Sequence, residues 1–445
     1  MQKFKNRYKI FVLLICFFSC ITSCSAQRSK TVNVKHYGAK GDGVSDDYQA
    51  ILAAVAEINR LGTGVLVFPK GIYFLKPYHT AQKTVQNIEL KNVDKVEIIG
   101  NNSVIKVNGK HHRGADYSTG GFNFSHTGAL IPMLINSSSN VTVRDLEIDG
   151  GVASTTRDAN LAEFGGHLIL ITNSQKVHLQ NLKVHHAQTD GIYIDGKSRN
   201  VTADQVESYQ NARQGMSIIE LHNGKFTNCI FRDTGRTGKY GGHSPQAGVD
   251  IEPHGAPDSV FNITFENCTF ENNIGSQFVI SHPGTTSNVL LKDCVFREKN
   301  GFHYAVIVNA KDVVFESCIF DFRQGSLYPL WQQEGSSSVI RNSLIKSESY
   351  GIVAVTGSDT NAVQLLNNTV EYVGKQPLEH YFPYIQMTNI IIENNRFIIP
   401  KRFGRVNTPT SLLQKAKRVK NNRFTDEKGA KIDIWVSYDL SNVVE

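Results

Sequence analysis

The 445-residue sequence predicts an all-β fold, a single-stranded right-handed parallel β-helix whose N-terminal end is capped by an α-helix. Three observations predict it. A phrase made of an alternating strand, an Asn, Asp or Cys, and a second short strand recurs mostly every 24 to 29 residues. Another alternating strand lies between successive phrases, and no helical periodicity interrupts them. Repeats of this length indicate stacked units, and units made only of strands form the coils of a solenoid.

The repeated phrase is clearest in "VTVRDLEIDG" (141–150), "GKFTNCIFRD" (224–233), "VVFESCIFDF" (313–322) and "IIIENNRFII" (390–399). Apolar residues at every second position place one face of each strand inside the coil. Four cysteines occupy the same slot of successive phrases: Cys229, Cys268, Cys294 and Cys318. Because equivalent slots stack in a solenoid, we expect these cysteines to form a column of small buried side chains rather than a metal site.

The first 23 residues are predicted to be a signal peptide. Four basic residues and no acid precede the apolar run "IFVLLICFFSCI", which is too short to span a membrane. The sequence Ile21-Thr22-Ser23-Cys24 resembles a bacterial lipobox with Cys24 as the lipidated residue, and the alternative is cleavage after Ala26. We therefore expect export, as a periplasmic or outer-membrane lipoprotein of a Gram-negative bacterium or as a secreted protein.

The remaining chain is predicted to be a short tether (24–31) followed by one β-helix domain (32–445). Removal of the four signal-peptide charges lowers the formal net charge from +7 to +3. A nearly neutral chain gives no reason to expect nucleic acid as a partner. Contact with a membrane is expected only through the lipid at the N-terminus.

The segment "VNVKHYGAKGDGVSDDYQAILAAVAEI" (32–58) reads as a Gly-rich turn followed by an apolar-striped helix over 47–59. Ser45 with Asp46 is the predicted helix N-cap. The segment resembles the opening of the pectate-lyase-like and polygalacturonase-like β-helix proteins. The resemblance implies the same fold, with the helix covering the open end of the solenoid. In this interpretation Asp42, Asp46 and Asp47 are structural.

The second strand of each coil can be aligned on the glycine that opens it, at Gly191, Gly215 and Gly248. This register predicts two inward columns, Ile192, Met216, Val249, Phe278 and Ile194, Ile218, Ile251, Ile280. It predicts two outward columns, Tyr193, Ser217, Asp250, Val279 and Asp195, Ile219, Glu252, Ser281.

Neighbouring coils then share one outer patch, made of Asp190, Tyr193, Asp195, Arg213, Asp250, Glu252, His254 and His282. A Gly-rich loop over 235–246 is expected to overhang this patch, with Lys239, Tyr240 and His243 facing the substrate. We expect a polysaccharide, an anionic plant or algal one, to bind these loop residues together with Asp190, Tyr193, Arg213, His254 and His282 of the patch. Arg213 would hold a carboxylate or sulfate.

Asp250 and Glu252 carry the predicted chemistry. Residues i and i+2 of a strand lie about 6.5–7 Å apart on one face, and inverting glycosidases hold their two carboxyl groups about 6.5–9.5 Å apart. One carboxyl would act as general acid, and the other, or Asp195, would activate water. This interpretation predicts a glycoside hydrolase that requires no cofactor.

Three alternatives stay open. A polysaccharide lyase or C5-epimerase would take its base from Arg213, Lys239, Tyr240 or a histidine, and Ca²⁺ could bind Asp190, Asp195 and Asp250. A non-catalytic solenoid would bind surface glycans. In the third alternative Asp250 and Glu252 are only surface charges, or one pairs with Arg213.

Two further motifs bear on these alternatives. The "GHG" of polygalacturonases is absent, so the resemblance carries the fold and not the specificity. The neighbouring His185 and His186 show no regular ligand spacing and are interpreted as surface or turn residues.

Overall fold

The structure is a computed structural model of the chain. It describes residues 30–76, 86–108, 110–111, 130–154, 156–157, 166–235, 244–281, 285–298, 304–322, 328–333, 335–348, 351–355, 362–375, 384–385, 389–403, 406–407, 417–432 and 434–435. The chain divides into two compact units, residues 1–30 and residues 31–445, and every element described below belongs to the second. No helix of the described ranges is long and apolar enough to cross a membrane.

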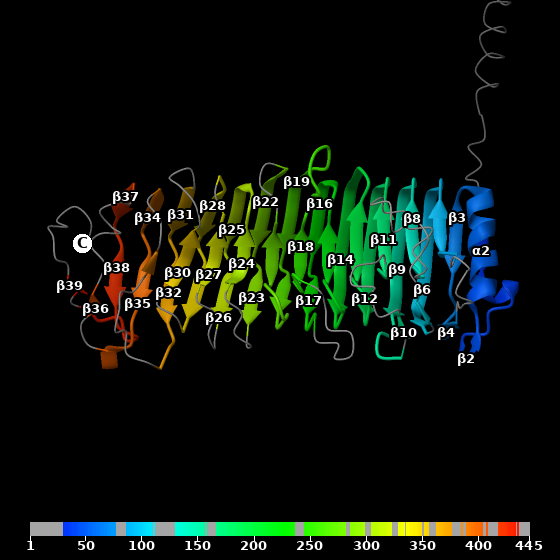
Figure 1. The fold of residues 1–445 in the computed structure, drawn as a ribbon, viewed down its shortest axis with the longest axis horizontal. Helices are drawn as coiled ribbons and strands as arrows, with labels where there is room; N and C mark the ends of the chain where they lie inside the picture. The colour runs from blue at the N-terminus through cyan, green and yellow to red at the C-terminus, as the bar shows by residue number, and fades with distance from the viewer. Residues whose placement is uncertain are drawn as a thin grey trace, which may run out of the picture. The chain divides into compact units, whose positions relative to one another are not determined.

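Residues 31–445 form a parallel β-helix, as predicted (Figure 1). Along most of the solenoid a coil contributes two strands to a 24-stranded sheet, called sheet 1, and one strand to an 11-stranded sheet, called sheet 2. Each strand pairs in parallel with the equivalent strand one coil later, so that Phe226 lies beside Phe265 and Phe265 beside Leu291. The alternating pattern of the repeats therefore sets both the architecture and the register.

Sheet 1 consists of β1 (Thr31–Asn33), β2 (Asp42–Asp46), β3 (Gly64–Val67), β4 (Ile72–Leu75), β6 (Asp94–Val107), β9 (Ser139–Asp149), β12 (Gln175–His185), β14 (Ser198–Tyr209), β16 (Leu221–Thr227), β17 (Ile230–Arg232), β19 (Val260–Glu266), β20 (Thr269–Glu271), β22 (Thr286–Lys292), β23 (Val295–Glu298), β25 (Lys311–Glu316), β26 (Ile319–Phe322), β28 (Ser337–Arg341), β29 (Leu344–Ser347), β31 (Ala362–Leu366), β32 (Thr369–Tyr372), β34 (Ile390–Glu393), β35 (Arg396–Ile398), β37 (Arg418–Lys420) and β38 (Arg423–Thr425).

Sheet 2 consists of β5 (Glu89–Lys91), β8 (Met133–Asn136), β11 (Ile169–Thr172), β13 (Ile192–Asp195), β15 (Met216–Ile218), β18 (Val249–Ile251), β21 (Phe278–Ile280), β24 (Tyr304–Val308), β27 (Tyr328–Gln332), β30 (Gly351–Val355) and β33 (Tyr384–Ile385). Two small sheets pair β7 (Lys110–His111) with β10 (Thr156–Arg157) and β36 (Val406–Asn407) with β39 (Ile434–Trp435). Two short 3₁₀ helices, η1 (Val34–Tyr37) and η5 (Lys401–Phe403), complete the set.

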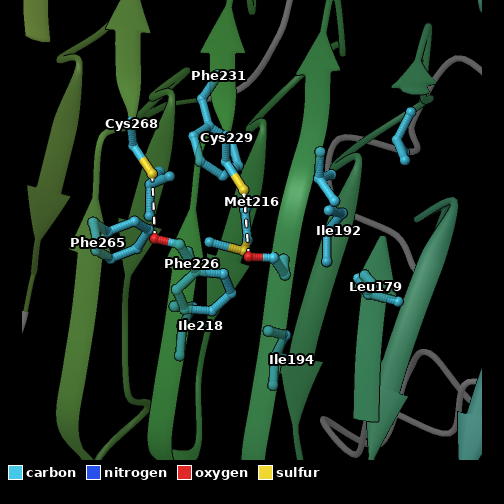
Figure 2. Close-up of a cluster of buried hydrophobic side chains, with 14 of the residues drawn as sticks. Leu179, Ile192, Ile194, Met216, Ile218, Phe226, Cys229, Phe231, Phe265 and Cys268 are labelled. Atoms are coloured by element: carbon cyan, nitrogen blue, oxygen red, sulfur yellow. Dashed lines mark hydrogen bonds between the residues drawn. The ribbon is translucent and has the colours of Figure 1, made fainter. Parts of the chain in front are cut away.

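In each of these coils the two strands of sheet 1 meet at a corner, and this corner explains the repeated Asn-Cys pair. Asn228 and Asn267 both adopt a left-handed conformation, with φ of 54°, which Asn tolerates better than most residues. The cysteine after each of them is buried and reduced, as predicted. Each thiol lies near a carbonyl of the preceding coil, with Sγ of Cys268 at 3.4 Å from the oxygen of Phe226 (Figure 2).

Asparagines take over the cysteine slot toward the C-terminal end. The Nδ2 of Asn395 donates to the carbonyl of Leu365 at 2.8 Å, and its Oδ1 accepts the backbone N–H of Asn368 at 2.8 Å. Asn422 makes the equivalent contacts one coil later. The slot thus satisfies backbone groups of two coils at a buried corner, which an apolar residue cannot do.

Phenylalanines fill the middle of the solenoid. Phe231, Phe270, Phe296 and Phe320 stack in one column, with ring centroids 5.5, 5.0 and 4.9 Å apart. All four are buried, because each occupies the inward position after its corner cysteine. Stacking of equivalent aromatic residues adds to the area that they bury and aligns successive coils.

The N-terminal end is capped by α2 (Tyr48–Leu61), which packs with its apolar stripe against β1, β3, β5 and η1. The predicted N-cap is wrong by one to two residues, because Asp47 holds that position and Ser45 and Asp46 lie in β2. Asp47 is fully buried and accepts the backbone N–H groups of Lys40 and Gly41 at 2.6 and 3.1 Å. Its role is therefore to hold the Gly-rich turn against the helix, as the structural interpretation expects.

Candidate functional site

The predicted register of sheet 2 is confirmed. Ile192, Met216, Val249 and Phe278 pair in sequence across β13, β15, β18 and β21 and point into the core. The outward column is confirmed as well, since Tyr193 lies beside Ser217, Ser217 beside Asp250, and Asp250 beside Val279. The sequence therefore places the residues of the predicted patch on adjacent strands.

The expectation that this column forms an open surface is wrong. Asp190 and Asp250 are 0% exposed, and Tyr193 is 2% exposed. A second apolar cluster lies on the outer side of sheet 2, made of Ile131, Leu134, Leu170, Tyr193 and Ile219. The two carboxyl groups lie against close polar partners, Asp190 against Arg213 and Asp250 against Gln214 and Ser281, and neither is in contact with solvent.

Arg213 forms an ion pair with Asp190. Its Nε and Nη2 donate to Oδ1 and Oδ2 of Asp190 at 2.8 and 2.6 Å, which makes the ion pair bidentate. Ser217 Oγ and the backbone N–H of Gln214 also donate to this carboxylate. Burial acts to raise the pKa of Asp190, but the charge and hydrogen bonds of Arg213 outweigh it and hold the pKa well below 3.8. The predicted role of Arg213 as a cation for a substrate carboxylate therefore conflicts with its protein partner.

His167 is a residue that the sequence analysis missed. Its Nδ1 lies 3.3 Å from Oδ2 of Asp190, and its ring stacks on Tyr193 with centroids 4.2 Å apart. Burial lowers the pKa of His167, opposed by its contact with Asp190. Extending the strand register one coil toward the N-terminus would have found it, because Ile169 pairs with Ile192 and this places His167 level with Asp190.

Asp250 is a buried acid with two hydrogen-bond donors. Ser281 Oγ donates to its Oδ1 at 2.9 Å, and Gln214 Nε2 donates to its Oδ2 at 3.3 Å. Burial and then the nearby charge of Glu252 raise the pKa of Asp250 to about 8, against an ordinary value of 3.8. The carboxyl group is therefore mostly neutral at neutral pH, and its burial keeps it out of contact with solvent.

Two other carboxyl groups reach the surface. Asp195 and Glu252 are half-buried, and each follows directly after a paired inward residue of its strand, Ile194 and Ile251. The strand between them is β15, which ends at Ile218. Backbone hydrogen bonds continue beyond the paired residues, since Ile219 N–H donates to the carbonyl of Ile194 and Glu252 N–H donates to the carbonyl of Ile218. Two strand spacings of about 4.8 Å place their Cα atoms about 9.6 Å apart.

The surroundings of Asp195 favour its protonated form. Burial raises the pKa of its carboxyl group, and the negative charge of Asp258 adds to the increase. The backbone N–H of Gly196 donates to its Oδ1 at 2.6 Å and opposes the shift, as does the exposed His254 nearby. Asp195 thus has the environment of a general acid, and Glu252 lies at the same level on the next coil but one.

Several predicted residues lie outside the described residues: Lys239, Tyr240, His243, His282 and Cys24. The alternative in which Ca²⁺ binds Asp190, Asp195 and Asp250 stays a prediction. Asp190 pairs with Arg213, and Asp250 takes its bonds from Ser281 and Gln214.

Comparison with known sequences defines the class of this fold and site. Residues 31–300 match the family described as rhamnogalacturonase A/epimerase, pectate lyase-like, and residues 243–397 match the right-handed β-helix region. The first match spans more than half of the chain. The chain therefore belongs to the rhamnogalacturonase A/epimerase, pectate lyase-like family, which confirms the predicted superfamily and the handedness of the solenoid.

Individual relatives are distant. The plasmin and fibronectin-binding protein A of Streptococcus pneumoniae is 24% identical over 404 residues, or 82% of this chain, and the chain spans half the length of that relative. The A-module of the mannuronan C-5 epimerase AlgE4 from Azotobacter vinelandii superposes with a TM-score of 0.54 at 18% identity, over 80% of this chain and 100% of that one. The Dettilon tailspike protein superposes with a TM-score of 0.51 at 11% identity, over 92% of this chain and 68% of that one. These two structural similarities show the fold.

Proposed function

We propose that this protein is an exported carbohydrate-active enzyme that cleaves a polysaccharide by inverting glycoside hydrolysis, with Asp195 and Glu252 as its acid and base. The observation that carries the proposal is the placement of two half-buried carboxyl groups, Asp195 at the end of β13 and Glu252 directly after β18, at one level with one strand between them. Membership of a family whose description includes a rhamnogalacturonase supports a polysaccharide substrate.

The spacing favours inversion over retention. Retaining enzymes hold their carboxyl groups about 5–5.5 Å apart, and inverting enzymes about 6.5–9.5 Å apart so that water fits between. Cα atoms about 9.6 Å apart allow the side chains of Asp195 and Glu252 to span the inverting distance when they lean toward each other. Asp195, whose pKa is raised by burial, would protonate the leaving oxygen, and Glu252 would activate water.

Asp250 takes a different role from the one expected for it. Its carboxyl group is fully buried below Glu252, so it supports the strand that carries Glu252 and does not contact the substrate. The neutral form of Asp250 also avoids a second negative charge next to Glu252. Asp250 is therefore a positioning residue in the proposed mechanism.

The test is a screen of anionic plant and algal polysaccharides, followed by reducing-end release and by ultraviolet absorbance of unsaturated products. We expect new reducing ends without absorbance, and NMR of the first product should show the inverted anomer. Asp195→Asn and Glu252→Gln should each lower kcat by about 10²- to 10⁴-fold, the usual contribution of a general acid or base. Asp312→Asn, at an exposed position of β25 in sheet 1, is the matched control and should keep full activity.

Full activity of both Asp195→Asn and Glu252→Gln would remove this site from the mechanism. Unsaturated product would contradict hydrolysis and support elimination. Binding of a glycan without any change in its covalent structure would favour a non-catalytic solenoid.

A polysaccharide lyase or C5-epimerase is the second candidate, favoured by His254. This exposed residue lies two positions after Glu252 and acts electrostatically on Asp195, so a base and an acid flank the same surface. The family description also includes an epimerase. Incorporation of solvent deuterium at C5 of a uronate without chain cleavage would identify epimerisation, and His254→Gln should abolish it. In the proposed hydrolase the same variant keeps its activity.

Export with a lipid on Cys24 completes the proposal. It rests on the sequence "ITSC" after a basic and apolar leader. Metabolic labelling with palmitate in a Gram-negative host should label the wild-type protein and not Cys24→Ala. Absence of label from the wild-type protein would favour cleavage after Ala26.

A further inference from the structure

Three side chains of residue types that can bind metal ions lie close together at the C-terminal ends of β9 and β12 in sheet 1. The Nδ1 atoms of His185 and His186 lie 2.6 Å apart, and Oδ1 of Asp149 lies 3.8 and 3.5 Å from them. Within the described residues this is the group of His, Cys, Asp and Glu whose ligand atoms lie close enough to share an ion. None of the three belongs to the proposed catalytic pair.

The backbone explains how adjacent histidines can face the same point. Successive side chains of a strand point to opposite faces, so two neighbouring histidines of a regular strand cannot share an ion. His186 follows the end of β12 and adopts a left-handed conformation with φ of 56°, which breaks the alternation and brings its ring beside that of His185. Parallel pairing of His185 with Asp149 on β9 supplies the carboxylate.

The ring of His185 is already oriented. Its Nε2 lies 3.3 Å from Oε1 of Glu147, and a carboxylate only accepts, so the ring carries its proton on Nε2 and presents a lone pair at Nδ1. Its face stacks on Tyr209 of the next coil, with centroids 4.6 Å apart and planes at 20°. A carboxylate on the far nitrogen is the arrangement that orients metal-binding histidines and raises their basicity.

His185 is 5% exposed, so its interpretation as a surface residue is wrong, whereas His186 lies at the turn as expected. The side chain of His186 is 35% exposed, which leaves the cluster open to solvent on one side. The site is therefore buried enough to orient its ligands and open enough for an ion to enter.

We propose that Asp149, His185 and His186 bind a divalent transition-metal ion, with zinc as the ion that fits best. Two imidazole nitrogens and one carboxylate oxygen match the ligands of Zn²⁺, whereas Ca²⁺ and Mg²⁺ take oxygen ligands. Three protein ligands leave a fourth position for water or for a substrate group.

Zinc binding requires a change of tautomer at His186. The 2.6 Å separation of the two Nδ1 atoms is that of a hydrogen bond, so His186 carries a proton that His185 accepts. An ion about 2.0–2.1 Å from both nitrogens requires that His186 carry its proton on Nε2 in place of Nδ1 and that the two rings separate slightly. Lys106 Nζ, 3.6 Å from Oδ2 of Asp149, is the competing cation at the carboxylate.

The experiment is a zinc titration of the full chain, purified without a polyhistidine tag and treated with EDTA, followed by calorimetry and by elemental analysis. We expect one zinc ion per chain and no displacement by excess Ca²⁺. His186→Asn keeps a residue that tolerates the left-handed backbone, and His185→Phe keeps the stack on Tyr209, so both variants should fold and lose the ion. Glu147→Gln should weaken zinc binding by about 10- to 100-fold.

His178→Asn is the control, because His178 lies on the same strand and hydrogen-bonds to Thr202 away from the cluster. It should bind zinc as the wild-type protein does. Equal zinc content of wild type, His186→Asn and His185→Phe would overturn the proposal, as would displacement by Ca²⁺ or an absence of binding to the wild-type protein. Asp195→Asn should lose polysaccharide cleavage and still bind zinc as the wild-type protein does. This proposal and the proposed function can therefore fail separately.

Discussion

Arg213 and Asp190 form a bidentate ion pair between adjacent coils, with Asp190 fully buried and the Arg213 side chain 14% exposed. The pair joins the segments that precede β13 and β15, and Asp195 lies at the end of β13. It is therefore a structural support of the candidate site.

Removing one partner of this pair should destabilise the protein strongly. Arg213→Ala leaves a buried carboxylate without its cation, and loss of one partner of a buried pair costs about 3–5 kcal/mol. Urea unfolding followed by circular dichroism measures the change. Arg341→Ala is the matched control, because its pair with Glu316 is largely exposed and should contribute at most about 1 kcal/mol. Equal effects of the two variants would show that Arg213 is not a structural residue.

Asp250 should make stability depend on pH in an unusual direction. Because its pKa is raised from 3.8 to about 8 in the folded protein, the folded state binds a proton that the unfolded state has released between these values. The contribution of Asp250 to stability is therefore complete below about pH 4 and is lost progressively as the pH rises to about 8. Asp250→Asn removes this loss, so its stability relative to wild type should increase over that range.

The measurement is the urea midpoint of wild type and variant at a series of pH values, taken as a difference so that other groups cancel. Asp312→Asn is the control, because Asp312 is exposed and Asn tolerates its left-handed φ of 57°. A difference for Asp250→Asn that does not change with pH would contradict the raised pKa.

Gln214 Oε1 is buried without a partner among the described residues, and a half-turn of this amide would let it accept the proton of neutral Asp250.

The corner amides should each contribute measurably to stability. Asn395→Ala leaves the buried N–H of Asn368 and the carbonyl of Leu365 without a partner, at about 1–3 kcal/mol for each group. Asn394→Gly, one residue earlier on the exposed side, keeps the left-handed corner and should be nearly neutral. Thermal unfolding compares the two, and similar losses would show that the amide column is not what holds the corner.

The pH profile of the proposed activity should respond to Asp258. Its negative charge helps to raise the pKa of Asp195, so Asp258→Asn should lower that pKa. The alkaline limb of kcat/KM, where a general acid loses its proton, should then move to lower pH. Asp312→Asn should leave the limb in place. An unchanged or upward-moved limb in Asp258→Asn would argue against Asp195 as the acid.

Local alternation was sufficient to predict the solenoid. Ile192 and Ile251 could be assigned to the core because a one-residue slip would expose every apolar residue of their strands. The burial of Cys229 and Cys268 followed from their equivalent slots. The alternating strands and the corner slot repeat from coil to coil, so each coil of the one sequence tests the same prediction again.

The burial of Asp250 could not be predicted in this way. It depends on contacts between coils, since Gln214 before β15 and Ser281 after β21 both hydrogen-bond to its carboxyl group. Likewise, the left-handed turn at His186 decides whether two adjacent histidines converge, and histidine alone does not reveal it. Non-repeated contacts thus determine the site, whereas the repeat determines the frame.

The corner inside sheet 1 has the same length from coil to coil: two residues join β16 to β17 (228–229), β19 to β20 (267–268) and β34 to β35 (394–395). The connection from sheet 1 to sheet 2 instead runs over 233–248 before β18 but over only 348–350 before β30. Insertions at this second corner leave the stacking of the coils unchanged. Under the proposed function, exchanging such segments between family members is therefore a route to changed glycan specificity on an unaltered scaffold.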